Sequence, residues 1–157
     1  MSKFLYLGLE FLNKAIYVPK IKCSNKKELL RNVAHLLIEK HHLKSFTEKE
    51  VLDAFLRRER YGSTSIGRGI AIPHVRLWHH TSIYAGFFTV DPPIDFDSWD
   101  TPIDPVFLII GYIAPEDSAD EHLKTLAFLA ELTYYSDRSN ITQLETPDQL
   151  KSYTKWY

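Results

Sequence analysis

The stretch from residue 62 to residue 74 holds three of the chain's six glycines, three consecutive hydroxyl residues and a histidine that follows proline. Pro73 has a fixed φ and biases the residue before it towards extended geometry. We therefore expect residues 70–72 to form a short buried strand that holds His74 at its end. A neutral imidazole fixed in this way is a candidate nucleophile, because it carries a ring nitrogen with a free lone pair.

The same stretch offers groups that suit an anion such as phosphate. Ser63 and Thr64 place hydroxyls beside backbone amides, and glycines such as Gly67 permit backbone conformations that other residues avoid. Two common phosphate loops are excluded, because no Gly-Lys-Ser/Thr follows the glycines and Ile72 stands where the dinucleotide fingerprint needs glycine. The residues alone leave two interpretations open: a phosphate cradle, or a structural connection that merely places His74 at the end of a core strand.

A predicted helix brings arginines to this stretch. The capping box Thr47-x-x-Glu50 precedes apolar residues at helical spacing, so the helix should run to about residue 60. Its C-terminal end carries Arg57, Arg58 and Arg60. Interaction with the helix dipole, worth about 0.3–1 kcal/mol for each exposed arginine, is one explanation of this cluster. The other is that a guanidinium holds a phosphoryl group by a forked pair of hydrogen bonds.

A second histidine is expected at the start of a later helix. Ser118-x-x-Glu121 is a plausible cap, and it places His122 in the first turn, where unpaired amides and the positive end of the dipole favour an anion. The apolar face expected for this helix consists of Leu123, Leu126, Ala127, Ala130 and Thr133 or Tyr134.

The remaining elements predict a layered α/β arrangement, because strands alternate with helices along the chain. Strands are expected at residues 16–21, 82–90 and 105–113, a helix after the cap Asn25, and a short C-terminal helix capped by Thr146. Residues 91–93, Asp-Pro-Pro, should end the second of these strands. The pair His41-His42 is expected to be solvated in a short connection, without a function.

Composition limits the class of protein. With 157 residues, 45% of them hydrophobic, the chain suits a single domain spanning residues 1–157. Nineteen basic and twenty acidic residues leave a formal charge of −1, which gives no general attraction to nucleic acid. Cys23 is the only cysteine, so an internal disulfide or a cysteine zinc cluster is excluded and a reducing cytoplasm fits. No apolar run approaches the roughly 20 residues that span a bilayer, and we expect the apolar start to belong to the domain.

Two motifs together resemble a known family. Glu59, six residues, Ile66-Gly67, two residues and Ile70-Ala71-Ile72-Pro73-His74 resemble the signature of the enzyme IIA domains of the fructose/mannitol family of the bacterial phosphotransferase system (PTS). Glu121-His122-Leu123-x-x-Leu126 is similar to the second histidine motif of that family, and Arg58-Glu59-x-x-Gly62-Ser63-Thr64 to its lead-in. The likeness extends over nearly the whole chain. Length and start are most similar to the free-standing nitrogen-regulatory members.

The resemblance implies a fold, a chemistry and partners. The fold would be an α/β domain with a mixed sheet packed between helices. His74 would be the phosphorylated histidine, Arg58 the arginine that steadies the phosphoryl group, and His122 the neighbouring site histidine. The donor would be a histidine phosphocarrier of the HPr or NPr type, charged by enzyme I, and the phosphorylation state would regulate a target protein. Neither a metal nor another cofactor is implied.

Three positions depart from the family pattern. Ser65 stands where glycine is usual, Arg68 where asparagine is frequent, and Val75 where a small residue, usually glycine, follows the histidine. A β-branched residue disfavours positive φ and would crowd an incoming partner, so Val75 predicts slower phosphorylation or an unusual donor. Two alternatives therefore stay open: the IIA component of a sugar-transport system with its permease elsewhere, and a binding module that keeps the fold without the chemistry.

Overall fold

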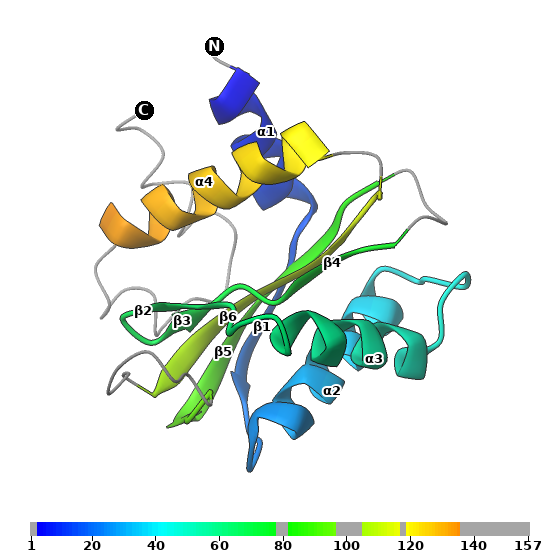
Figure 1. Ribbon diagram of the computed structural model, residues 1–157, viewed down its shortest axis with the longest axis vertical. Coiled ribbons are helices and arrows are strands. Elements are labelled where there is room, and N and C mark those ends of the chain that lie inside the picture. The colour runs from blue at the N-terminus through cyan, green and yellow to red at the C-terminus, as the bar shows by residue number, and fades with distance from the viewer. Residues whose placement is uncertain (1–2, 78–81, 97–104, 117–118, 136–157) are drawn as a thin grey trace.

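The computed structural model describes residues 3–77, 82–96, 105–116 and 119–135. The expected C-terminal helix after Thr146 and the cap residue Ser118 lie outside these ranges. The described part forms three layers (Figure 1), with a mixed sheet in the middle. Helices α2 (Lys26–Lys40) and α3 (Glu48–Glu59) cover one face of the sheet, and α1 (Lys3–Lys14) and α4 (Ala119–Tyr135) cover the other. The predicted α/β fold with a sheet between helices is confirmed.

The sheet has six strands within the described residues: β1 (Ile16–Ile21), β2 (Ser65–Gly67), β3 (Ile70–Ala71), β4 (His74–Arg76), β5 (Tyr84–Ile94) and β6 (Val106–Ala114). Their order is β1-β5-β6-β3-β2, and β4 continues beside β6 beyond β3. Strand β5 runs antiparallel to β6, whereas β3 and β4 run parallel to it. Two short strands from the glycine-rich stretch therefore lie against one long central strand.

Strand β6 is the centre of the core, because all nine of its residues are buried. Alternation along the strand sends side chains to opposite faces. Ile109 and Ile113 join the apolar cluster under α2 and α3, and Leu108, Ile110 and Tyr112 join the cluster under α1 and α4. A strand buried on both faces explains why this segment reads as a continuous apolar run.

Two of the helices begin where their caps predict. The Asn25 side chain accepts a hydrogen bond from the Glu28 amide at 2.8 Å, and α2 starts at the next residue. Thr47 accepts one from the Glu50 amide at 3.1 Å before α3. Each bond satisfies an amide that the first helical turn leaves without a partner.

The predicted packing face of α4 is only partly right, because Thr133 is buried and Leu126 is partly buried against the core, but the other predicted positions are exposed. Leu123 and Tyr134 are each 66% exposed, and Ala127 and Ala130 are also exposed. Besides Thr133, the helix buries His122, Thr125, Phe128, Leu129 and Leu132. Both stripes have helical spacing, but the stripe with Phe128 and two leucines removes more apolar surface from water, which favours its burial.

The predicted end of the second long strand is also wrong, because β5 continues through Asp91, Pro92 and Pro93 to Ile94. These three residues are exposed, and the register with β6 shifts between Thr89 and Ile94. Proline lacks an amide donor, so an exposed irregularity of the ladder is where a strand tolerates it.

His41 is not the solvated residue that its polar neighbourhood predicts. Its Nε2 donates a hydrogen bond to the Ala85 carbonyl at 2.9 Å, and its ring meets Tyr84 edge-on. The histidine therefore ties the end of α2 to the start of β5.

The apolar start of the chain forms α1, which contributes Phe11 and Leu12 to the core. None of the described helices is long and apolar enough to cross a membrane. Helix α1 packs closely on α4 at Gly8, where an added Cβ would collide with the Phe128 ring.

We expect Gly8→Ala to destabilise the fold. Alanine gains about 0.5–1 kcal/mol of helix propensity over glycine, but overpacking against Phe128 should cost about 1–3 kcal/mol. Urea unfolding should therefore show a lower midpoint for the variant. Asn13→Ala on the exposed side of the same helix is the matched control, and it should leave the midpoint unchanged or raise it. A higher midpoint for Gly8→Ala would show that the two helices separate without cost.

Candidate functional site

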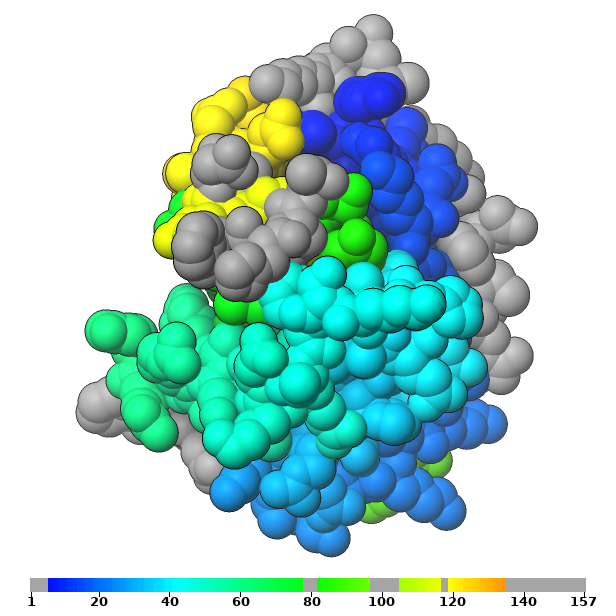
Figure 2. Space-filling view, turned by 90° about the vertical axis from the view of Figure 1, so that its right-hand side faces the viewer, coloured from blue at the N-terminus to red at the C-terminus, as the bar shows by residue number. Residues whose placement is uncertain are grey.

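A hollow of about 320 Å³ opens between the C-terminal end of α3 and the start of α4, at the end of β6. Figure 2 shows the side of the molecule on which α3 lies below the first turns of α4. The hollow is lined by Ala54, Arg57, Arg58, Tyr61, His74, Val75, Arg76, Leu77, Glu116 and His122. The structure thus brings together the three residues singled out in the sequence, His74, Arg58 and His122, from separate elements.

His74 is the first residue of β4, and its backbone is held in register with Tyr112 of β6. Its Nδ1 lies 2.6 Å from the Ile72 carbonyl oxygen. A carbonyl only accepts, so Nδ1 carries the proton and Nε2 keeps its lone pair. Burial lowers the pKa of His74, the bond to Ile72 opposes this shift, and the charge of Arg58 reinforces it. The imidazole is therefore neutral at pH 7, as a nucleophile requires.

His122 is buried beside His74, with the two ring centroids 5.0 Å apart. Its Nδ1 lies 3.1 Å from the Tyr112 hydroxyl. Burial, and then the charges of His74, Arg76 and Arg58, lower the pKa of His122 to about 4. The second histidine is therefore also neutral at pH 7, and one of its ring nitrogens serves as a hydrogen-bond donor.

A pH titration followed by NMR should show these shifts. We expect the His122 ring to take up a proton near pH 4 and the His74 ring below the ordinary value of about 6.5. Because histidines of the unfolded chain take up protons near 6.5, the folded state should lose stability as the pH falls from there towards 4. A His122 midpoint near 6.5 would contradict the burial of this ring.

Arg58 is held at the rim of the hollow by its own loop, since its Nη1 donates to the Gly62 carbonyl at 3.0 Å. A guanidinium has five donors in a planar fork, so this bond is compatible with a second, forked contact to an anion. Arg57 also lines the hollow, whereas Arg60 does not. The structure therefore distinguishes between arginines that sequence spacing alone leaves equivalent.

The three residues expected to cradle the anion lie outside the lining of the hollow. The Thr64 hydroxyl donates to a Glu59 carboxylate oxygen at 2.8 Å, and the Thr64 amide donates to the same carboxylate. Ser63 Oγ accepts from the Ser65 amide at 3.1 Å, and the Gly67 amide faces the Ser65 hydroxyl at 3.5 Å. The sequence suggested that these hydroxyls and amides bind an anion, but in the structure they form hydrogen bonds with other groups of the protein.

Glu59 organises this loop from the end of α3. Its carboxylate pairs with Lys26 at 3.4 Å, and both side chains are largely buried. It therefore joins the start of α2, the end of α3 and the loop at Thr64 through one carboxylate. A buried carboxylate with this many partners fixes the loop that leads to His74.

Two residues of the hollow's surroundings were missed in the sequence. Arg76 lies two residues after His74 in β4, so period 2 places both on the same face of the strand. Tyr112 is the one residue with a polar tip in the apolar run of β6. The spacing of Arg76 from His74 and the tyrosine in the apolar run are visible in the sequence. They point to the site only once the structure shows that His74 starts a strand beside β6.

The departure at Val75 has a structural explanation. Val75 lies in β4, buried and paired with Ile113, where a β-branched side chain fits well. Positive φ occurs instead at Arg68 (57°), between Gly67 (84°) and Gly69 (82°). The expected backbone conflict at Val75 is wrong, and the left-handed position is the one where asparagine is frequent in the family resembled. Val75 lines the hollow, so the expected crowding of an incoming partner stays a prediction.

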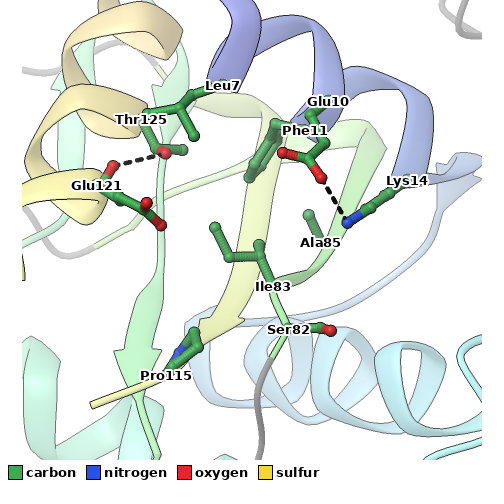
Figure 3. Close-up of a pocket in the computed structure, with 10 residues that line it drawn as sticks. All are labelled: Leu7, Glu10, Phe11, Lys14, Ser82, Ile83, Ala85, Pro115, Glu121 and Thr125. Carbon is green, nitrogen blue, oxygen red and sulfur yellow. Dashed lines mark hydrogen bonds and ion pairs between the residues drawn. The ribbon is translucent and has the colours of Figure 1, made fainter. Parts of the chain in front are cut away.

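A second, smaller cavity of about 130 Å³ lies between α1 and α4 (Figure 3). Glu121 lines it, although the next residue, His122, faces the hollow. Two polar contacts lie in its lining: Glu10 pairs with Lys14, and the Thr125 hydroxyl donates to the Glu121 carbonyl within α4. The three candidate residues do not line this cavity.

Comparison with known proteins places this chain in a family. A family profile described as "Phosphoenolpyruvate-dependent sugar phosphotransferase system, EIIA 2" matches residues 10–155. The chain belongs to this EIIA type-2 family. Among curated EIIA relatives, the nitrogen regulatory protein of Bradyrhizobium diazoefficiens is 40% identical over 116 residues, which cover 73% of this chain and 72% of the relative. That of Escherichia coli is 36% identical over 121 residues, covering 76% and 71%.

Solved EIIA structures agree with the fold. The nitrogen regulatory protein IIA-Ntr from Neisseria meningitidis superposes with a TM-score of 0.78 at 27% identity, covering 93% of this chain and 97% of the other. The IIA mannitol protein of Escherichia coli matches with a TM-score of 0.62 at 22% identity, covering 88% and 94%, which shows a shared fold. The expected membership in this EIIA family, with relatives of the nitrogen-regulatory kind, is confirmed.

Proposed function

We propose that the protein is a phosphoryl carrier that accepts a phosphoryl group on Nε2 of His74 and regulates other proteins through its phosphorylation state. The observation that carries this proposal is the hydrogen bond from Nδ1 of His74 to the Ile72 carbonyl, which leaves Nε2 as the nucleophilic nitrogen. EIIA membership and the nitrogen regulatory relatives support the same reading. The domain responsible would be the whole chain, residues 1–157.

The transfer would be a direct exchange between two histidines. The Nε2 lone pair of His74 forms the new N–P bond as the N–P bond of the donor breaks, and that electron pair returns to the donor imidazole. The proton of His74 stays on Nδ1, hydrogen-bonded to the Ile72 carbonyl, so the phosphorylated ring carries a positive charge until that proton is released. The charge balances when the donor ring is itself protonated on its other nitrogen and leaves as a neutral imidazole. The donor would be the phosphohistidine of an HPr- or NPr-type carrier protein, itself charged by enzyme I.

Charge at the hollow supports this chemistry. The transferred group carries negative charge on three oxygens, and Arg58, Arg76 and His122 line the hollow beside His74. Donors that are already in place stabilise developing charge without reorganisation. Because both histidines are neutral, the arginines that line the hollow, Arg57, Arg58 and Arg76, supply the positive charge and His122 supplies a neutral donor.

The direct test is labelling with purified components. Phosphoenolpyruvate, enzyme I and an HPr- or NPr-type carrier should add one phosphoryl group per chain, and the label should be labile in acid, as a phosphohistidine is. Omitting the carrier protein should prevent labelling. A chain that binds the carrier but takes no label from either type of donor would instead be a binding module on the same fold.

A sugar-transport role is the second candidate, because the family description itself names sugar phosphotransfer. In that case a membrane permease would draw the phosphoryl group from His74 onto a sugar. Loss of the label on addition of fructose or mannitol with the matching permease would favour transport. A label that persists with the permease and sugar present would favour regulation.

A further inference from the structure

Tyr112 lies behind both histidines of the site. It is fully buried, and its ring is stacked on the His74 ring, with centroids 5.5 Å apart and planes within 17°. Its ring is also roughly perpendicular to that of Phe11, with centroids 5.5 Å apart, and its hydroxyl lies 3.1 Å from Nδ1 of His122. One side chain therefore contacts the ring of one histidine and a nitrogen of the other.

The direction of the Tyr112–His122 hydrogen bond follows from the buried surroundings. Tyr112 could donate to Nδ1, or it could accept from an Nδ1–H. In the second case the buried hydroxyl proton would need its own acceptor, and the described part of the chain offers it none besides His122. A buried donor without a partner costs about 1–3 kcal/mol, so Tyr112 donates and Nδ1 accepts. Burial also raises the pKa of Tyr112, which keeps the phenol protonated.

We propose that Tyr112 is a positioning residue that fixes His122 in the tautomer with its proton on Nε2, so that this histidine presents an N–H rather than a lone pair to the phosphoryl group. The consequence for phosphoryl transfer rests on the proposed function, whereas the tautomer itself does not. A neutral imidazole without this partner could carry its proton on either ring nitrogen. The wrong tautomer would turn a lone pair towards the negatively charged oxygens and weaken their stabilisation.

The first arm of the test reads the tautomer in the unphosphorylated full chain. Nitrogen-15 NMR of the histidine rings should show a protonated Nε2 and an unprotonated Nδ1 for His122 at pH 7. In Tyr112→Phe, which keeps the ring and the apolar packing, the His122 signals should move towards a mixture of tautomers. Tyr17→Phe is the matched control, since its hydroxyl donates to the Leu12 carbonyl and its ring stacks on Phe87. It should leave the His122 signals unchanged.

The second arm measures phosphoryl transfer. Tyr112→Phe should take up label about tenfold more slowly than the wild type, an effect of the size of one hydrogen bond, whereas Tyr17→Phe should match the wild type. A wild-type His122 protonated on Nδ1, or an unchanged tautomer in Tyr112→Phe, would overturn the proposal. If the wild type takes no label at all, the proposed function fails, and the NMR arm still decides the role of Tyr112. If Tyr112→Phe does not fold, the wild-type tautomer decides.

Discussion

His74→Gln is expected to abolish phosphoryl labelling completely. Glutamine is polar and similar in size, but its amide has no nucleophilic nitrogen, so no N–P bond can form at this position. The lost acceptor is the Nε2 lone pair that the bond to the Ile72 carbonyl leaves available. Mass spectrometry after incubation with phosphoenolpyruvate, enzyme I and the carrier protein measures the result directly. The control is His35→Gln on the exposed surface of α2, which should be labelled as fully as the wild type.

The same experiment separates the two site histidines. His122→Gln removes a donor near the phosphoryl group but leaves the nucleophile, so it should slow labelling by about 10²-fold without preventing it, which is the scale of losing one preorganised donor. Label that persists in His74→Gln but disappears in His122→Gln would reverse the two assignments. Label that persists in both would place the acceptor elsewhere in the chain.

The layers of the fold could be predicted from helix caps and apolar runs in the sequence, because the apolar residues are the ones buried between the layers. The caps at Asn25 and Thr47 and the apolar run of β6 identify elements whose boundaries the structure reproduces within a residue or so. Helix α4 shows the limit of such signals, because it carries two apolar stripes and only packing against α1 decides which is buried. Strand order shows it too, because nothing local places β3 and β4 beside β6.

The residues of the candidate site could be predicted where the residue type alone indicates the chemistry. They could not be predicted where the role of a residue depends on its hydrogen-bond partner in the folded chain. His74, Arg58 and His122 could be proposed from type, helix position and family resemblance, and the structure brings them to one hollow. The hydroxyl of Thr64 could not be assigned, because its partner Glu59 belongs to α3 and its orientation is a tertiary result. The role of Tyr112 could not be predicted for the same reason, because it depends on the register of β4 with β6, which pairs Tyr112 with His74.

Arg58→Ala should reduce the rate of phosphoryl transfer to His74 by about 10²- to 10³-fold, as expected when a preorganised cationic donor is lost. Arg58 lines the hollow, and its charge acts on both site histidines. Arg58→Lys should recover only part of the rate, because an ammonium keeps the charge but lacks the planar fork. Rapid-quench measurement of label against time, at saturating phosphorylated carrier, gives the transfer rate for each variant.

Arg60→Ala is the matched control for this prediction, because Arg60 lies at the end of the same helix but outside the lining of the hollow. Its transfer rate should match that of the wild type, apart from a small effect on docking that added salt would remove. Equal losses in the Arg58 and Arg60 variants would mean that the arginines only attract the carrier protein. Arg58 also bonds the Gly62 carbonyl, so urea unfolding of both variants must accompany the kinetics. A slow Arg58→Lys variant with wild-type stability would then attribute the loss to the forked contact with the phosphoryl group.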